Sequence, residues 1–130
     1  MKRKFLWLLV GIAAGVVTTI PAGAHHPVAT VYFSDRTQAI QGTLVEIKFR
    51  NPHSFVYVEA PDEKGRMQRW AVEWLAVLQL YRQGVKSGTL KAGDRLVITG
   101  YPARNSNEHQ LRLRTIARPK DGWTWGGTFE

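Results

Sequence analysis

The residues best suited to chemistry in this sequence are its four histidines, His25, His26, His53 and His109. His25 and His26 directly follow Ala22-Gly23-Ala24, which has the small-x-small pattern of a signal-peptidase site. Cleavage after Ala24 gives a mature chain whose first residue offers both its free amine and its imidazole to a metal ion. Cu(II) prefers nitrogen ligands in tetragonal geometry. The sequence therefore suggests, as one alternative, a copper site at His25, completed by the imidazole of His53 or, as second choice, of His26; the other alternative is that His25 and His26 are simply the start of the mature chain.

Residues 1–24 are predicted to be a secretory signal. Lys2, Arg3 and Lys4 precede an apolar stretch, residues 5–20, of 16 residues, which is shorter than the roughly 20 needed to span a bilayer. We therefore expect a periplasmic or secreted protein with no membrane span in its mature form. Removing 24 of the 130 residues leaves 106, enough for one domain. The leader carries three of the 18 Lys and Arg and none of the 10 Asp and Glu, so the mature formal charge is +5.

Several classes of active site are excluded or unsupported. The chain has no cysteine, which excludes disulfides, thiolate catalysis and Cys-based metal sites. Ser54 lacks the context of a nucleophile elbow. Glu73 has no second carboxylate beside it, and we expect it to pair with Arg82 or Arg104 rather than to act as an acid. The sequence thus predicts a protein that is not an enzyme.

Hydrophobic periodicity predicts five strands and one short helix. Residues of the first strand alternate, with Thr43, Val45, Ile47 and Phe49 on one side and Leu44, Glu46 and Lys48 on the other. The second strand is apolar on both faces. In the later strands the residues expected to share a face are Trp70, Val72 and Trp74, then Leu96 and Ile98, then Leu111 and Leu113, the last two inward. The strands are expected within residues 40–50, 54–60, 67–74, 95–100 and 110–117. A helical stripe, Trp74, Val77, Leu78 and Tyr81, follows the third strand and ends at Gly84.

The order β-β-β-α-β-β is that of the OB-fold. We therefore expect an all-β protein with one short helix, a small five-stranded OB-like β-barrel, with a small sandwich as the alternative. The predicted organisation is signal peptide 1–24, N-terminal arm 25–37, OB-like barrel 38–118 and C-terminal tail 119–130. The arm is expected to be irregular with one short strand within residues 28–33. The Gly-rich tail around Trp123-Thr124-Trp125 permits no prediction.

A candidate binding site lies at the rim of the predicted barrel. Asn51-Pro52-His53 stands where the first strand turns into the second; His53 is a candidate ligand, although Asn51 and His53 could equally bond the backbone of a turn. His109 lies in a polar loop and is expected to be solvated. The residues proposed to contact a ligand or partner are Asn51, His53, Trp70, Glu73 and Arg104.

Single-stranded nucleic acid is an improbable partner for this chain, even though OB-folds often bind it. Trp70, Trp74, Phe55 and Tyr57 are expected on faces that the core requires. An exported protein also does not ordinarily meet nucleic acid.

Five motifs occur in a fixed order: Ala24-His25-His26, Asn51-Pro52-His53, Trp70-Ala71-Val72-Glu73, Leu90-Lys91-Ala92-Gly93-Asp94 and Gly100-Tyr101-Pro102-Ala103-Arg104. The set resembles a family of small exported bacterial proteins of unknown function, over nearly the whole mature chain. In that family Ser-Phe often follows the two histidines, whereas Pro27-Val28 stands here. The resemblance implies export and a small β-barrel, but no activity, cofactor or catalytic residue.

Three classes of function remain after these observations. The first is an exported, non-enzymatic binding or accessory module for an unknown small ligand or periplasmic protein. The second is a copper-binding protein that uses His25 with His26 or His53, and copper is the one cofactor that the residues suggest. The third is an enzyme whose site leaves no recognisable motif.

Overall fold

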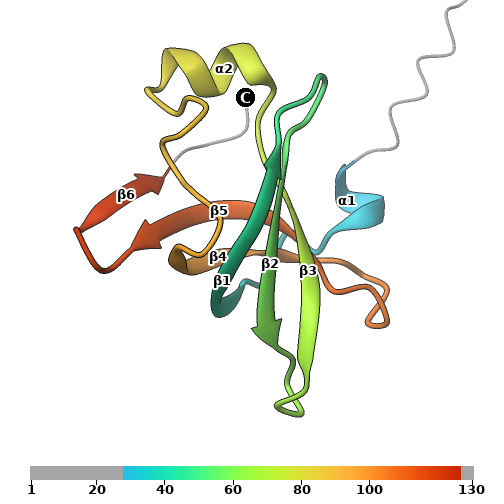
Figure 1. The fold of residues 1–130 in the computed structure, drawn as a ribbon. Helices are drawn as coiled ribbons and strands as arrows, with labels where there is room; N and C mark the ends of the chain where they lie inside the picture. The colour runs from blue at the N-terminus through green and yellow to red at the C-terminus, as the bar shows by residue number, and fades with distance from the viewer. Residues whose placement is uncertain (1–27, 127–130) are drawn as a thin grey trace, which may run out of the picture.

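The protein is a small β-barrel with two short helices (Figure 1). A computed structural model describes residues 28–126; the predicted signal peptide, His25 and His26 lie outside the described residues. The elements are α1 (Val28–Val31), β1 (Gln38–Lys48), β2 (Phe55–Pro61), β3 (Met67–Glu73), α2 (Val77–Arg82), β4 (Arg95–Pro102), β5 (Gln110–Arg118) and β6 (Trp123–Gly126).

The strands form one sheet in the order β3-β2-β1-β4-β5-β6. A parallel pairing of β3 with β5, in which Val72 lies opposite Leu111, closes the first five strands into a barrel. All other neighbouring strands are antiparallel. This topology, with α2 between β3 and β4, confirms the predicted OB-like barrel.

The barrel is filled by the inward side chains of every strand and by residues around α2. Alternation on β3, β4 and β5 is as predicted, because Val72, Leu96, Ile98, Leu111 and Leu113 are all fully buried. The rest of the core consists of Ile40, Leu44, Val56, Val58, Ala60, Trp70, Trp74, Leu75, Leu80, Val85, Leu90, Ile116 and Trp125.

The predicted faces of β1 do not hold along the whole strand, because Leu44 and Ile47, expected on opposite sides, both face the core. The pairing of β1 with β2 shifts by one residue between Leu44 and Glu46, which marks a β-bulge. A bulge inserts an extra residue, so Leu44 is buried while Ile47 also packs against the core. Nearby, Gly42 has no room for a side chain, because a Cβ there would lie 2.1 Å from the carbonyl oxygen of Glu59.

The helical stripe predicts α2 correctly but not its buried face. The helix covers Val77–Arg82 and Gly84 follows it with φ of 83°. Leu80 is its buried residue, whereas Leu78 and Tyr81 are 60% and 42% exposed. Tyr81 packs edge-on against Phe49 with ring centroids 6.3 Å apart.

Two segments outside the predicted barrel join it. Residues 28–31 form the helix α1 instead of the predicted strand, and Tyr32 then makes a single antiparallel bridge with Ala103. At the other end, β6 pairs with β5, and Trp125 packs edge-on against Trp74 at 5.1 Å. α1 lies outside the barrel, on the side of β3 and the β4–β5 loop (Figure 1).

Candidate functional site

A buried carboxylate at the end of β3 joins two parts of the chain that are far apart in sequence. Glu73 is 8% exposed. Its Oε2 accepts a 2.6 Å hydrogen bond from the hydroxyl of Tyr32, and its Oε1 lies 2.6 Å from Nδ1 of His53. Glu73 thus contacts Tyr32 and His53 rather than the Arg82 or Arg104 that the sequence suggested. We call Tyr32, His53 and Glu73 the shared-carboxylate cluster.

The loop that carries His53 is held by its neighbours on both sides. Ser54 is fully buried; its amide donates to the carbonyl of Leu75, and its own carbonyl accepts from the amide of Trp74 at 2.7 Å. The hydroxyl of Ser54 accepts a bond from the amide of Arg50. These bonds fix the backbone beside His53, so the imidazole is presented from a defined position. Its side chain remains 41% exposed.

The contact with Glu73 decides which nitrogen of His53 is available. A carboxylate only accepts hydrogen bonds, so Nδ1 must carry the proton that lies between the two groups. In the neutral ring Nε2 then holds the lone pair. Metal-binding histidines are commonly oriented in this way, with one nitrogen donating to a carboxylate and the other facing the metal.

Tyr32 ties the N-terminal arm to the same carboxylate. The residue is 3% exposed, and its hydroxyl also accepts a 2.7 Å hydrogen bond from Nε2 of Gln110. Burial raises the pKa of Tyr32 above its ordinary value, and the hydrogen bond to Glu73 raises it further. The phenol therefore keeps its proton and acts as a donor to Glu73. Arg112 on β5 lies opposite Glu73 in the strand register and adds positive charge nearby.

Arg104 fastens the arm at a second point. Its Nε donates to the carbonyl of Ala29 at 2.6 Å, and its amide donates to the carbonyl of Val31. Its guanidinium also lies over the ring of Phe33, 4.7 Å from the centroid. The described chain therefore reaches Val28, three residues after His25, while held against the barrel.

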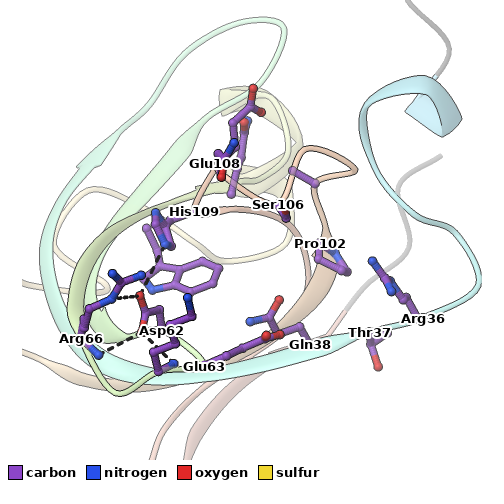
Figure 2. Close-up of a pocket in the computed structure, with 15 residues that line it drawn as sticks. Arg36, Thr37, Gln38, Asp62, Glu63, Arg66, Pro102, Ser106, Glu108 and His109 are labelled. Carbon is purple, nitrogen blue, oxygen red and sulfur yellow. Dashed lines mark hydrogen bonds and ion pairs between the residues drawn. The ribbon is translucent and has the colours of Figure 1, made fainter.

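A polar pocket of about 480 Å³ is lined in part by Gln110, the residue that also donates to the hydroxyl of Tyr32. It is bounded by the β2–β3 turn, the β4–β5 loop and the segment before β1. Figure 2 shows Asp62 and Arg66 bonded together on one side and Arg36 on the opposite side. Its lining comprises Arg36, Thr37, Gln38, Asp62, Glu63, Lys64, Arg66, Trp70, Pro102, Ala103, Ser106, Asn107, Glu108, His109 and Gln110.

Asp62 organises the β2–β3 turn at the edge of this pocket. Its carboxylate accepts bonds from the amides of Lys64 and Arg66, from Nε of Arg66 and from Nε2 of Gln68. The hydrogen bond from the Arg66 amide is the main cause that lowers the pKa of Asp62 to about 2, and the hydrogen bond from the Gln68 side chain also lowers it. Asp62 is therefore ionised and saturated with donors, which makes it a structural group of the turn.

His109 is not the solvated loop residue that the sequence suggested. Its ring packs edge-on against Trp70 with centroids 5.2 Å apart, and its side chain is 28% exposed. Trp70 itself is 4% exposed and donates its indole N–H to the carbonyl of Ala60. Trp70 thus belongs to the core and also lines the pocket.

The aromatic residues of β2 face outward, which corrects one argument made from the sequence. Phe55 and Tyr57 are only partly buried and stack with centroids 6.3 Å apart, while Val56 and Val58 fill the core. Lys48 and Arg69 lie 5.1 and 5.0 Å from the Tyr57 ring. The core does not require Phe55 and Tyr57, so the expectation that nucleic acid is an improbable partner keeps the support of buried Trp70 and Trp74 but not of these two residues.

The structure brings together only part of the predicted site. Glu73 and His53 are in contact, Trp70 lines the separate pocket, and Arg104 contacts the segment that contains α1. Asn51 is exposed and is joined to Pro52 by a cis peptide bond. Tyr32, Gln110 and Arg36 were missed, because no local motif marks a contact between residues 41 or 78 positions apart.

Within residues 28–126, no group of three or more His, Cys, Asp or Glu side chains could hold a metal ion. His53 therefore needs donors from elsewhere in the chain to form a metal site, and His25 and His26 lie outside that range. The same part of the chain contains no helix long and apolar enough to cross a membrane.

Comparison with known proteins identifies one family. The model of a family of unknown function, DUF6152, matches residues 14–112, which is more than half of the chain. A comparison with curated proteins finds no match. The resemblance inferred from the motifs is thus confirmed at the level of a family of unknown function.

Proposed function

The chain belongs to this family of unknown function, and from its own geometry we propose that it is an exported, non-enzymatic binding module that holds Cu(II). In this proposal the signal peptide is removed after Ala24. The amine and imidazole of His25 chelate the metal, and Nε2 of His53 completes a three-nitrogen site. His26 is the second choice for the third nitrogen.

The single observation that carries this proposal is the 2.6 Å contact between Nδ1 of His53 and Oε1 of Glu73. It leaves Nε2 as the available nitrogen and orients the ring. Carboxylate partners of this kind commonly contribute about 10–100-fold to metal affinity.

The second support is the reach of the arm. Tyr32 and His53 contact the two oxygens of the same carboxylate, so the arm is anchored next to the candidate ligand. The three residues from His25 to Val28 span at most about 11 Å. Covalent geometry therefore keeps the mature N-terminus close to the place where α1 is fastened.

Composition supports a Cu(II) site over other divalent metals. A set of one amine and two imidazoles contains nitrogen donors alone, and Cu(II) stands highest among the first-row divalent ions for such donors. Mg²⁺ and Ca²⁺ require oxygen ligands. The chain has no cysteine to favour Cu(I) or a thiolate zinc site.

Native mass spectrometry of protein recovered from the periplasm tests processing and metal binding together. We expect a mass that begins at His25 and one copper ion per chain. A His53→Ala variant, prepared in the same way, should have the same N-terminus and no bound copper. A wild-type protein that retains residues 1–24, or one that is processed at His25 but binds no copper, contradicts the proposal.

A further inference from the structure

We propose that the polar pocket between the β2–β3 turn and the β4–β5 loop binds a small polyhydroxylated acid, whose single oxyanion is held by Arg36. This site is separate from the proposed copper site and does not depend on it. Its volume of about 480 Å³ is within the range of small-molecule sites.

Arg36 is arranged to receive an anion. Its guanidinium lies over the ring of Phe33, with Cζ 3.5 Å from the centroid. Stacking of this kind holds the planar group while its N–H donors, which lie in the plane, stay free for a bidentate acceptor. Among residues 28–126, Arg36 forms no ion pair with a carboxylate. The guanidinium of Arg36 is therefore held in place with its N–H groups available to an anionic ligand.

Arg104 also contacts the ring of Phe33. Its guanidinium lies 4.7 Å from the same ring, but its Nε is already bonded to the carbonyl of Ala29. Arg104 thus fixes Phe33 and the arm, whereas Arg36 remains the one that lines the pocket. Both arginines contact the ring of Phe33, but only Arg36 lines the pocket.

The remaining lining indicates the body of the ligand. Thr37, Gln38, Ser106 and Asn107 supply hydroxyl and amide groups that can both donate and accept. Such groups satisfy hydroxyls in any orientation. An apolar ligand would leave these groups without partners, at a cost in free energy.

The balance of charges in the pocket argues against a ligand with several negative charges. Three basic residues (Arg36, Lys64 and Arg66) face three acidic ones (Asp62, Glu63 and Glu108). Arg66 and Asp62 neutralise each other through their 3.1 Å contact. The lining is therefore neutral in sum, and it would not attract a polyanion such as nucleic acid. Glu63 and Glu108 instead provide acceptors for ligand hydroxyls, although Glu108 already accepts a bond from Asn105.

Isothermal titration calorimetry with three probes tests this inference. Glucuronate carries one carboxylate on a hydroxylated ring, glucose lacks the charge, and glucose 6-phosphate carries up to two. We expect glucuronate to bind and glucose to bind about 10–100-fold more weakly, the usual value of a charge-assisted hydrogen bond. Equal binding of glucose and glucuronate, or no binding of glucuronate at about 10 mM, overturns the proposal. Tighter binding of glucose 6-phosphate overturns the single-charge argument.

Matched variants assign the effect to Arg36. Arg36→Ala should lose the preference for glucuronate over glucose, while Arg36→Lys should retain part of it because charge remains without the bidentate geometry. Arg114→Ala, which removes an exposed arginine of β5 that does not line the pocket, is the control and should bind as the wild type does. Far-ultraviolet circular dichroism confirms that each variant is folded. Wild-type glucuronate binding by folded Arg36→Ala contradicts the assignment.

Discussion

Replacing Glu73 with alanine tests whether the shared-carboxylate cluster holds the arm to the barrel. The change removes the acceptor of the Tyr32 hydroxyl and of the His53 ring at once. His53 is 41% exposed, so water can replace most of its lost contact. Tyr32 is 3% exposed, and its proton would be left without an acceptor inside the protein.

The expected loss of stability comes mainly from Tyr32. A buried donor left without a partner costs about 1–3 kcal/mol, and a hydrogen bond to a charged group contributes about 1.5–3 kcal/mol. Part of this is recovered, because the desolvated carboxylate is itself removed. We therefore expect Glu73→Ala to lower the free energy of unfolding by about 2–3 kcal/mol. Glu73→Gln, which keeps the shape and one acceptor, should lose about 1 kcal/mol.

Urea unfolding followed by tryptophan fluorescence measures these values. A double-mutant cycle with Tyr32→Phe isolates the contact, since two residues that interact directly are not additive. We expect a coupling energy of about 1–2 kcal/mol between Tyr32 and Glu73. A loss below about 0.5 kcal/mol for Glu73→Ala, or additive effects in the cycle, would refute the idea that this carboxylate anchors the arm.

Three further predictions concern the barrel. Gly42→Ala should lower the free energy of unfolding by at least about 3 kcal/mol, because its Cβ would lie 2.1 Å from a backbone oxygen. Gly126→Ala is the control in the same urea assay: its nearest contact would be at 3.6 Å, and its free energy of unfolding should stay within about 0.5 kcal/mol of the wild type. Trp70→Ala should cost about 3–5 kcal/mol, and an unchanged melting temperature would show that the indole is not part of the core. A hydrogen bond from Lys120 is the main cause that holds the pKa of Asp94 below its ordinary value. The stability from this carboxylate is therefore complete above the unfolded pKa of about 4 and is lost as the pH falls towards the folded value. Asp94→Asn should reduce the loss of the free energy of unfolding as the pH falls below about 4. A variant that loses as much as the wild type over this pH range would argue against the ion pair.

Periodicity predicted those parts of the fold in which each strand keeps its register. On β3 and β5 the alternation of Val72, Leu111 and Leu113 with polar residues gives the buried face directly. On β1 the same reasoning failed, because the bulge between Leu44 and Glu46 reverses the faces and leaves no mark in the residue types.

The arm shows how tertiary contacts can override local preference. Three of the four residues 28–31 are β-branched, which favours a strand. The segment is nevertheless a helical turn closed by the bond from the Tyr32 amide to the Val28 carbonyl. Arg104 holds it there through the carbonyls of Ala29 and Val31. No signal in residues 28–31 could have predicted a partner 75 positions away.

The residue types of the candidate site could be predicted from the sequence, but not which of these residues contact one another. His53 and Glu73 were both recognised from the sequence, because imidazole and carboxylate side chains are the usual groups of binding sites. Their contact follows from the antiparallel pairing of Phe55 with Glu73, which brings the loop before β2 against the end of β3. Tyr32 and Gln110 meet there only because β3 pairs with β5 and closes the barrel.

The most direct test of the central claim is a Cu(II) titration of the mature protein beside two variants. One variant carries an extra glycine before His25, which moves the free amine away from the imidazole, and the other is His53→Ala. We expect the mature protein to bind one Cu(II), and each variant to bind it at least about 10–100-fold more weakly. If all three bind alike, or if none binds more tightly than a free His-His peptide, the folded copper site does not exist.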